Sequence, residues 1–174
     1  MLTGAPVTDL KVTLLTGRSH LKHTEGGDFR EAVYRAVRQG LASAKSVLLE
    51  PFYDFTVTVP VEAVGRVLAD LQRRQGSFSS PQTEGGFAAL KGRGPAACFL
   101  DYAAELPAFT GGRGSFTAVF GGYEPCHNAE EVIAAAGYDF ERDTENPAGS
   151  VFCSHGAGYP VSWDEVPSHA HCAL

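Results

Sequence analysis

The sequence predicts an α+β protein whose central part has the element order βαββαβ. Apolar residues alternate with polar ones over residues 55–59 and 115–122, as they do in half-buried strands. They recur with helical spacing over residues 61–74 and 95–106, and the pair Gly85-Gly86 stands between two further short strand-like segments. Two strand-helix-strand units joined by a central hairpin form a four-stranded antiparallel sheet with both helices on one face, the ferredoxin-like arrangement.

The first 45 residues predict a strand, a long loop and a helix. Alternation over residues 10–14 indicates the strand, and residues 18–27 have no apolar periodicity and end in two glycines. A loop of about ten residues is longer than most connections, and long loops often have a function. Asp28 followed by Glu31 has the spacing of a capping box and predicts a helix that runs to about residue 44. One strand and one helix cannot enclose a core, so we expect this piece to belong to a larger sheet whose remaining strands are missing or supplied elsewhere.

The central elements follow in order. Pro60 ends the strand at residues 55–59 and begins a helix for which Gly76 is a natural C-terminal cap. The hairpin strands are expected at residues 78–83 and 87–91. The helix predicted over residues 95–106 has four residues on its inward face: Cys98, Phe99, Tyr102 and Leu106.

The last segment, residues 125–174, differs in composition. Asn128 and Glu131 form an N-cap and N3 pair that predicts a helix of about two turns ended by Gly137. An acidic linker follows, and residues 150–166 contain enough apolar bulk for a small hairpin. The formal charge is +3 over the first 45 residues and −7 over residues 126–174. A basic first segment can bind phosphates even in a protein of net charge −6.

Composition excludes several classes of protein. No apolar run approaches the roughly 18 residues that span a bilayer, and the first 30 residues lack a signal-peptide core. Four scattered cysteines do not make a disulfide scaffold, so we expect a cytoplasmic protein with no membrane partner.

Four motifs resemble translation elongation factor G and its relatives, the ribosomal-protection tetracycline-resistance proteins. They are Gly4-Ala5-Pro6-Val7-Thr8-Asp9, Gly17-Arg18-Ser19-His20, Asp28-Phe29 and Leu48-Leu49-Glu50-Pro51. The resemblance implies that residues 1–45 are the end of domain IV with a tip loop at 18–27, that residues 46–124 are the ferredoxin-like domain V, and that residues 125–174 are an acidic tail. The tail, with Cys153-Ser154-His155-Gly156-Ala157-Gly158, looks like a branch of the resistance proteins, to which we expect the closer match.

The resemblance also implies which residues contact RNA. The tip loop would lie against 16S ribosomal RNA at the decoding centre, where tetracycline binds, through Arg18, Ser19, His20, Leu21, Lys22 and His23. Cationic side chains and imidazoles suit phosphates, base edges and stacking. His20 matches a histidine of elongation factor G, whereas resistance proteins have other side chains there, so the choice between drug displacement and translocation of tRNA and mRNA stays open. From composition alone, a solvated loop with chance basic residues is the competing interpretation.

The phosphate-binding motif G-x-x-x-x-G-K-[ST] is absent, so this chain is not expected to be the GTPase and no catalytic residue is predicted. We expect a fragment of a longer protein whose amino-terminal part binds GTP and Mg²⁺. By the resemblance, its partners would be the decoding centre and the factor-binding region of the large ribosomal subunit.

A different class of function is a zinc-binding module in the tail that recruits a protein. Thiolate and imidazole are the ligands that zinc prefers, although the spacing here is poor. The candidates are Cys153, His155, His169, His171 and Cys172. A nucleophilic pair of Cys153 and His155 is less favoured, because no orienting carboxylate or oxyanion hole can be identified.

Overall fold

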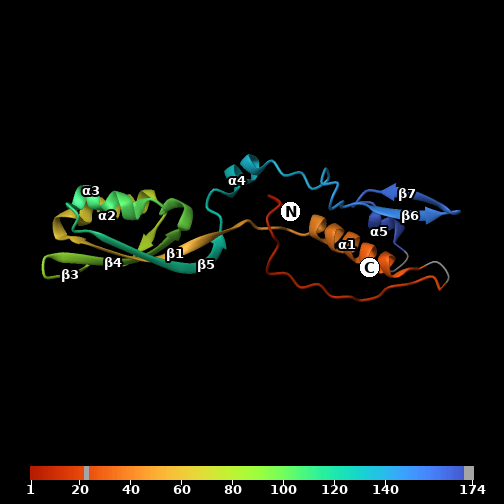
Figure 1. The fold of residues 1–174 in the computed structure, drawn as a ribbon, viewed down its shortest axis with the longest axis horizontal. Coiled ribbons are helices and arrows are strands. Elements are labelled where there is room, and N and C mark those ends of the chain that lie inside the picture. Colours follow the sequence, from red (N-terminus) through yellow and green to blue (C-terminus); the bar gives the residue numbers. More distant parts are fainter. Residues whose placement is uncertain (22–23, 171–174) are drawn as a thin grey trace. The chain divides into compact units, whose positions relative to one another are not determined.

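The computed structural model describes residues 1–21 and 24–170. The chain forms two compact units: unit 1 is Met1–Val47 with Glu130–Leu174, and unit 2 is Leu48–Ala129. The elements, drawn in Figure 1, are α1 (Gly26–Ser43), β1 (Leu49–Pro60), α2 (Val64–Arg73), β2 (Ser77–Phe78), β3 (Gln82–Glu84), β4 (Phe87–Pro95), α3 (Tyr102–Thr110), β5 (Ser115–Pro125), α4 (Ala129–Ala136), β6 (Ser150–Ser154), β7 (Ala157–Val161) and α5 (Val166–His169).

Unit 2 has the predicted ferredoxin-like topology. Its sheet has the strand order β2-β4-β1-β5, with every pair antiparallel and β3 also paired with β4. Helices α2 and α3 both lie on one face of this sheet (Figure 1). The second predicted strand is divided into β2 and β3 around Pro81, which lacks the N–H that a ladder needs. The Gly85-Gly86 turn has positive φ angles of 57° and 83°, as expected for the hairpin.

The core of unit 2 lies between the sheet and its two helices. Alternate β1 residues Phe55, Val57 and Val59 face inward and are almost fully buried. Phe99 and Tyr102, both predicted to face inward, pack edge to face with ring centroids 6.0 Å apart. The buried apolar cluster consists of Phe55, Val57, Val59, Val67, Leu71, Leu90, Phe99, Tyr102 and Leu106.

Two helix boundaries in unit 2 differ from the prediction. The left-handed residue after α2 is Gln75, at φ 60°, and not Gly76. The N–H of Gly76 donates to the carbonyl of Leu71 at 2.8 Å, which places Gly76 one residue further along the capping motif. The helix predicted over residues 95–106 is a 3₁₀ turn followed by α3, which continues past Pro107 because Thr110, one turn after Leu106, is buried too.

In unit 1, the strand predicted over residues 10–14 is wrong. These residues have no ladder partner in the part of the chain that the structure describes, and Val12 and Leu14 are 64% and 85% exposed. Alternation favours a strand only where a neighbouring strand can accept its hydrogen bonds. Helix α1 also begins earlier than predicted: its N-cap is Glu25 and Asp28 is the N3 residue of the capping box.

The tail elements of the prediction are confirmed. Helix α4 begins directly after Asn128 and is followed by Gly137 at φ 57°. Strands β6 and β7 form the expected small antiparallel hairpin. Trp163, which follows this hairpin, packs its ring against Phe140 with centroids 5.7 Å apart. Among the described residues, no helix combines the length and the apolar character needed to cross a membrane.

Candidate functional site

The predicted contact loop lies directly before α1 and is exposed. Arg18, Ser19, His20 and Leu21 are all exposed, and the side chain of Leu21 is fully accessible. Lys22 and His23 lie outside the described residues. The backbone N–H of His20 donates to Oγ1 of Thr24 at 2.8 Å, which joins the two sides of the loop. The loop therefore presents a cation, polar groups and an apolar side chain to solvent.

The start of α1 is occupied by the protein's own carboxylates. Oδ2 of Asp28 accepts a hydrogen bond from the N–H of Glu25 at 2.9 Å within the capping box. These two negative groups offset the positive end of the helix dipole. An anion at this loop would therefore be bound by cationic side chains of residues 18–23 and not by the helix terminus.

Helix α1 buries no residue, although its sequence is amphipathic. Phe29, Val33 and Tyr34 are 56%, 53% and 59% exposed. This agrees with the argument that one helix and one extended segment cannot enclose a core.

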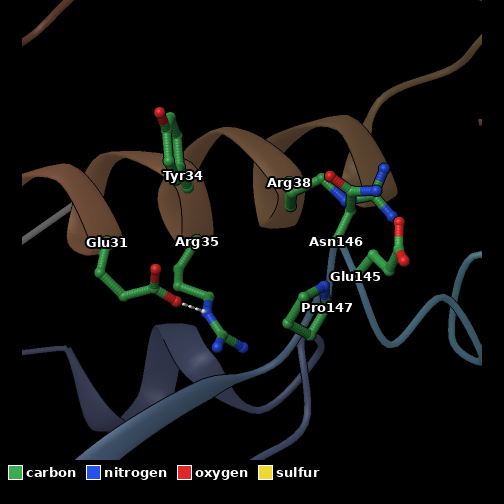
Figure 2. Close-up of a pocket in the computed structure, with 7 residues that line it drawn as sticks. All are labelled: Glu31, Tyr34, Arg35, Arg38, Glu145, Asn146 and Pro147. Atoms are coloured by element: carbon green, nitrogen blue, oxygen red, sulfur yellow. Dashed lines mark hydrogen bonds and ion pairs between the residues drawn. The ribbon is translucent and has the colours of Figure 1, made fainter.

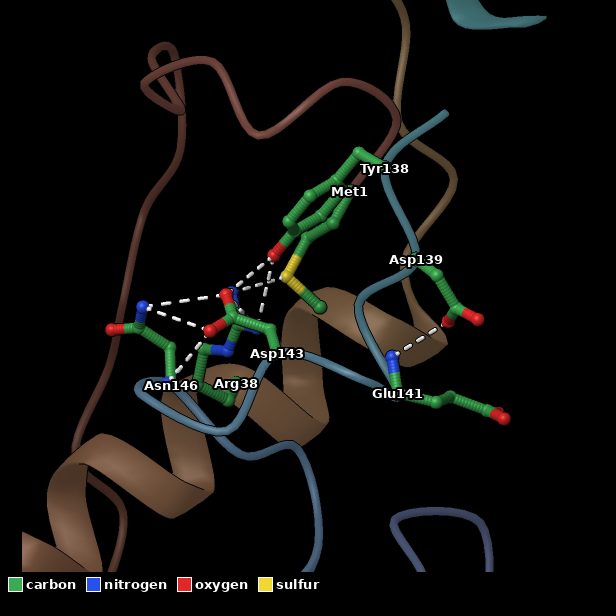
Figure 3. A network of polar contacts seen from close by, with 7 residues as sticks. All are labelled: Met1, Arg38, Tyr138, Asp139, Glu141, Asp143 and Asn146. Carbon is green, nitrogen blue, oxygen red and sulfur yellow. Dashed lines mark hydrogen bonds and ion pairs between the residues drawn. The ribbon is translucent and has the colours of Figure 1, made fainter. Parts of the chain in front are cut away.

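The acidic tail pairs with the basic side of α1 within unit 1. Figure 3 shows the side chains of Arg38, Tyr138 and Asp143 joined in one polar cluster. Nη2 of Arg38 lies 3.4 Å from Oδ2 of Asp143 and donates to the hydroxyl of Tyr138 at 3.2 Å. The Tyr138 hydroxyl in turn donates to Asp143 at 2.9 Å, and this hydrogen bond is the main cause that lowers the pKa of Asp143.

Arg35 makes a second link between α1 and the tail. Its Nε contacts Oε1 of Glu31 at 2.5 Å, and its Nη1 donates to the carbonyl of Gly149 at 2.8 Å. Figure 2 shows the small pocket beside it, lined by α1 and residues 145–147. Its volume of about 70 Å³ is well below the 300 Å³ or more of typical ligand pockets, so it is a packing gap and not a substrate site.

Arg93 of unit 2 is a structural residue that the sequence did not reveal. It lies on β4 opposite Asp54 of β1, on the sheet face away from the inward-facing Phe55. Its guanidinium contacts Asp54 Oδ1 at 2.9 Å and Glu124 Oε1 at 2.6 Å, and donates to the carbonyl of Gly121 at 2.7 Å. These contacts join three strands beside the irregular register of β1 and β5. No periodicity in the sequence could indicate such a network.

The structure describes three of the five predicted zinc ligands of the tail. Cys153 is exposed on β6, His155 is in the β6–β7 turn, and His169 ends α5. Nδ1 of His169 lies 3.4 Å from the Tyr159 hydroxyl. None of these three residues belongs to a group of three metal-ligating side chains among residues 1–21 and 24–170. His171 and Cys172 lie outside the described residues, so the tail site stays a prediction.

Two family models match consecutive segments of the chain. A sequence model of elongation factor G domain IV matches residues 1–45, and one of the elongation factor G C-terminus matches residues 47–132. A crystal structure of a protein from Thermus thermophilus is similar at 37% sequence identity and a TM-score of 0.52, over 55% of this chain and 15% of that one.

Curated relatives agree with these matches. Elongation factor G 2 of Streptomyces coelicolor is 42% identical over 122 residues, which cover 70% of this chain and 18% of the relative. Elongation factor G of Gluconobacter oxydans is 36% identical over 77% of this chain and 19% of its own length. Elongation factor G 1 of Synechocystis is 38% identical over 78% of this chain and 20% of its own length. The chain thus spans about a fifth of the length of these relatives. It belongs to the elongation factor G family and contains sequence of its C-terminal domains IV and V.

Proposed function

We propose that this chain is the C-terminal, ribosome-contacting part of an elongation factor G paralogue that acts in translocation of tRNA and mRNA. The observation that supports this most is the order of the two family matches, domain IV at residues 1–45 followed by the C-terminus at 47–132. GTP and Mg²⁺ would be bound by another part of the parent protein, since the phosphate-binding motif is absent here. The parent would act in the cytoplasm.

In this proposal the 18–23 loop contacts small-subunit RNA at the decoding centre. The exposure of residues 18–21 supports that role, because RNA loops are recognised by side chains that reach phosphates and splayed bases. Arg18 and Lys22 would bind phosphates, His20 and His23 would stack on or hydrogen-bond to bases, and Leu21 would pack against a base face. Unit 2 would bind near the factor-binding region of the large subunit.

Displacement of tetracycline is the weaker of the two functions considered. It rests on the resemblance of the tail to resistance proteins, whereas His20 matches a histidine of elongation factor G. The three relatives above are all named elongation factor G, so the comparisons favour translocation and give no support to a closer match with resistance proteins.

The test uses the complete parent protein in a single-turnover translocation assay on programmed ribosomes. Replacing residues 19–23 by Gly-Ser should slow translocation at least ~10-fold, because a misplaced contact group costs rate without removing the GTPase. A Gly-Ser replacement of residues 154–156, an exposed turn of the tail, is the control and should leave the rate unchanged.

The same proteins are then expressed in a susceptible bacterium on a tetracycline series. No translocation by the intact parent, together with drug resistance that the loop replacement abolishes, would replace our proposal by ribosomal protection. Full translocation by the loop variant would contradict the role of the loop while leaving the family membership intact.

A further inference from the structure

The chain enters unit 2 through β1 and leaves it through β5, and three metal-ligating residues meet where these strand ends pair. Glu50 lies near the start of β1, and Cys126 and His127 follow directly after β5. The N–H of Cys126 donates to the carbonyl of Leu48 at 2.9 Å, which extends the β1–β5 pairing to this point. One ligand atom from each of Glu50, Cys126 and His127 lies within 4.8 Å of the other two.

Glu50 is an unusual residue to find at such a position. It is only 8% exposed, and a buried carboxylate is unfavourable unless it is paired or coordinates a cation. Its Oε1 accepts the backbone N–H of His127 at 2.7 Å and lies 2.7 Å from Nδ1 of the same residue. The carboxylate is therefore held toward the imidazole, and its position is fixed by the backbone of the residue that would be its fellow ligand.

The sulfur of Cys126 lies within 4.8 Å of a ligand atom of each of these two residues. Its thiol donates to Oδ1 of Asn128 at 3.5 Å, and because a thiol is a weak donor, a metal could displace this hydrogen bond at little cost. Cys126 is partly buried and His127 remains accessible, with 31% of its side chain exposed. An ion can thus approach from solvent on the His127 side.

We propose that Glu50, Cys126 and His127 bind a divalent transition metal, with zinc as the preferred ion. Thiolate, imidazole and carboxylate are the three protein ligand types of zinc, whereas Mg²⁺ and Ca²⁺ prefer all-oxygen sites. Ligands held about 2.0–2.3 Å from a tetrahedral zinc lie roughly 3.3–3.6 Å from one another. The Glu50 oxygen and Nδ1 of His127, now 2.7 Å apart, would therefore separate slightly to admit the ion. The Cys126 sulfur, which lies within 4.8 Å of both ligand atoms, would move toward them by no more than about 1 Å. Three protein ligands leave the fourth tetrahedral position to water.

Binding has a defined proton balance. The thiol of Cys126 loses its proton to solvent, since only the thiolate binds zinc. Nδ1 of His127, which faces Glu50, becomes the metal ligand, and the ring proton resides on Nε2. The hydrogen bond between imidazole and Glu50 is exchanged for bonds of both groups to the ion. The metal then fastens the first strand of unit 2 to the end of its last strand.

Cobalt titration of the 174-residue chain under reducing conditions tests the proposal. We expect one equivalent of Co²⁺ to produce a sulfur-to-cobalt charge-transfer band in the near ultraviolet, and Zn²⁺ to abolish it. Cys126→Ser should remove the band and weaken zinc binding by ~100-fold or more, and His127→Gln or Glu50→Gln should weaken it at least ~10-fold. A Cys153→Ser, Cys172→Ser double variant keeps the proposed site and should bind normally.

Three results would overturn the assignment. They are no stoichiometric binding by the unaltered chain, a band that survives Cys126→Ser, and a band that is lost in the Cys153, Cys172 double variant, which would move the metal to the tail. Circular dichroism without metal checks that each variant is folded. If Cys126→Ser does not fold, the zinc affinity of His127→Gln tests the site instead. The His127 side chain is accessible to solvent, so this substitution leaves no cavity in the core.

Discussion

Gln75 is the residue whose backbone conformation suits its side chain least in unit 2. Its φ of 60° is in the left-handed region, where a side chain other than that of glycine, asparagine or aspartate is disfavoured. The conformation is kept because it completes the α2 cap: the N–H of Gln75 donates to the carbonyl of Gln72 at 3.0 Å. The cap hydrogen bonds and the following Gly76 thus outweigh the strain.

Gln75→Gly should therefore stabilise unit 2, by about 1 kcal/mol, because glycine adopts this conformation without strain. Urea unfolding followed by circular dichroism measures the change. Gln72→Gly is the matched control: the same substitution three residues earlier, inside α2, should destabilise by roughly 1 kcal/mol. Equal destabilisation by both substitutions would contradict the assigned cap.

Tyr102 is fully buried, and its hydroxyl has no hydrogen-bond partner among the described residues. Burial is the main cause that raises its pKa to about 12. Tyr102→Phe removes this unsatisfied group and keeps the ring that packs on Phe99, so we expect unchanged or higher stability, by up to about 1 kcal/mol.

Leu106→Ala is the contrast for this prediction, because it leaves a cavity in the same core and should cost about 2–5 kcal/mol. Both variants are compared by urea unfolding. A decrease of more than about 1 kcal/mol in the free energy of unfolding of Tyr102→Phe would mean that the hydroxyl makes a stabilising hydrogen bond, for example to a buried water.

At the scale of elements, the contact between α1 and the tail depends on charge. The carboxylate of Asp143 is stabilised by the hydroxyl of Tyr138 and by the backbone of Asn146, and its pKa is lowered in the folded chain. A lowered pKa means that the carboxylate stabilises the folded form above its ordinary pKa, and that this stabilisation is lost as pH falls through the lowered value. From α1, Arg38 pairs with this carboxylate, and Arg35 donates to the carbonyl of Gly149 in the tail.

We expect the tail to detach from α1 in acid, starting near about pH 4 and completing below it. Trp163, the single tryptophan, donates at 2.9 Å to Glu141, two residues before Asp143, so its fluorescence should follow a rearrangement of this segment. Asp143→Asn should give the detached signal already at neutral pH. Asp139→Asn, which removes an equal charge from the same segment, should keep the acid transition. Identical titrations of both variants would refute the role of Asp143.

Sequence patterns predicted the elements of unit 2 well because each has its own partners within about eighty residues. The alternation of β1, the Gly85-Gly86 turn and the inward-facing Phe99, Tyr102 and Leu106 are all local signals. The strand over residues 10–14 failed because alternation says nothing about whether a pairing strand is present. The N-cap of α1 was predicted wrongly because two residue pairs have capping-box spacing, Glu25 with Asp28 and Asp28 with Glu31. The structure uses the first pair.

At the scale of the whole molecule, the charge asymmetry of the sequence indicated a basic and an acidic segment but not that the two pair with each other. The first 45 residues are basic and the last 49 are acidic, and in unit 1 part of this charge is neutralised through Arg38 and Asp143, 105 residues apart. Pairing over such a separation has no sequence signal. The candidate loop could be located from its lack of periodicity, but the Glu50, Cys126 and His127 group could not, because only the β1–β5 pairing brings its members together.

The central claim is that the 18–23 loop binds ribosomal RNA through its cations. The most direct measurement is binding of the 174-residue chain to ribosomes by co-sedimentation across a salt series. Arg18→Glu with Lys22→Glu should weaken binding and make the slope of log affinity against log salt shallower, by about 0.7–0.9 for each phosphate that the variant no longer neutralises. Lys45→Glu with Arg142→Glu, the same charge change at exposed positions outside the loop, should leave the slope unchanged. An equal slope for the loop variant and the unaltered chain would contradict the account.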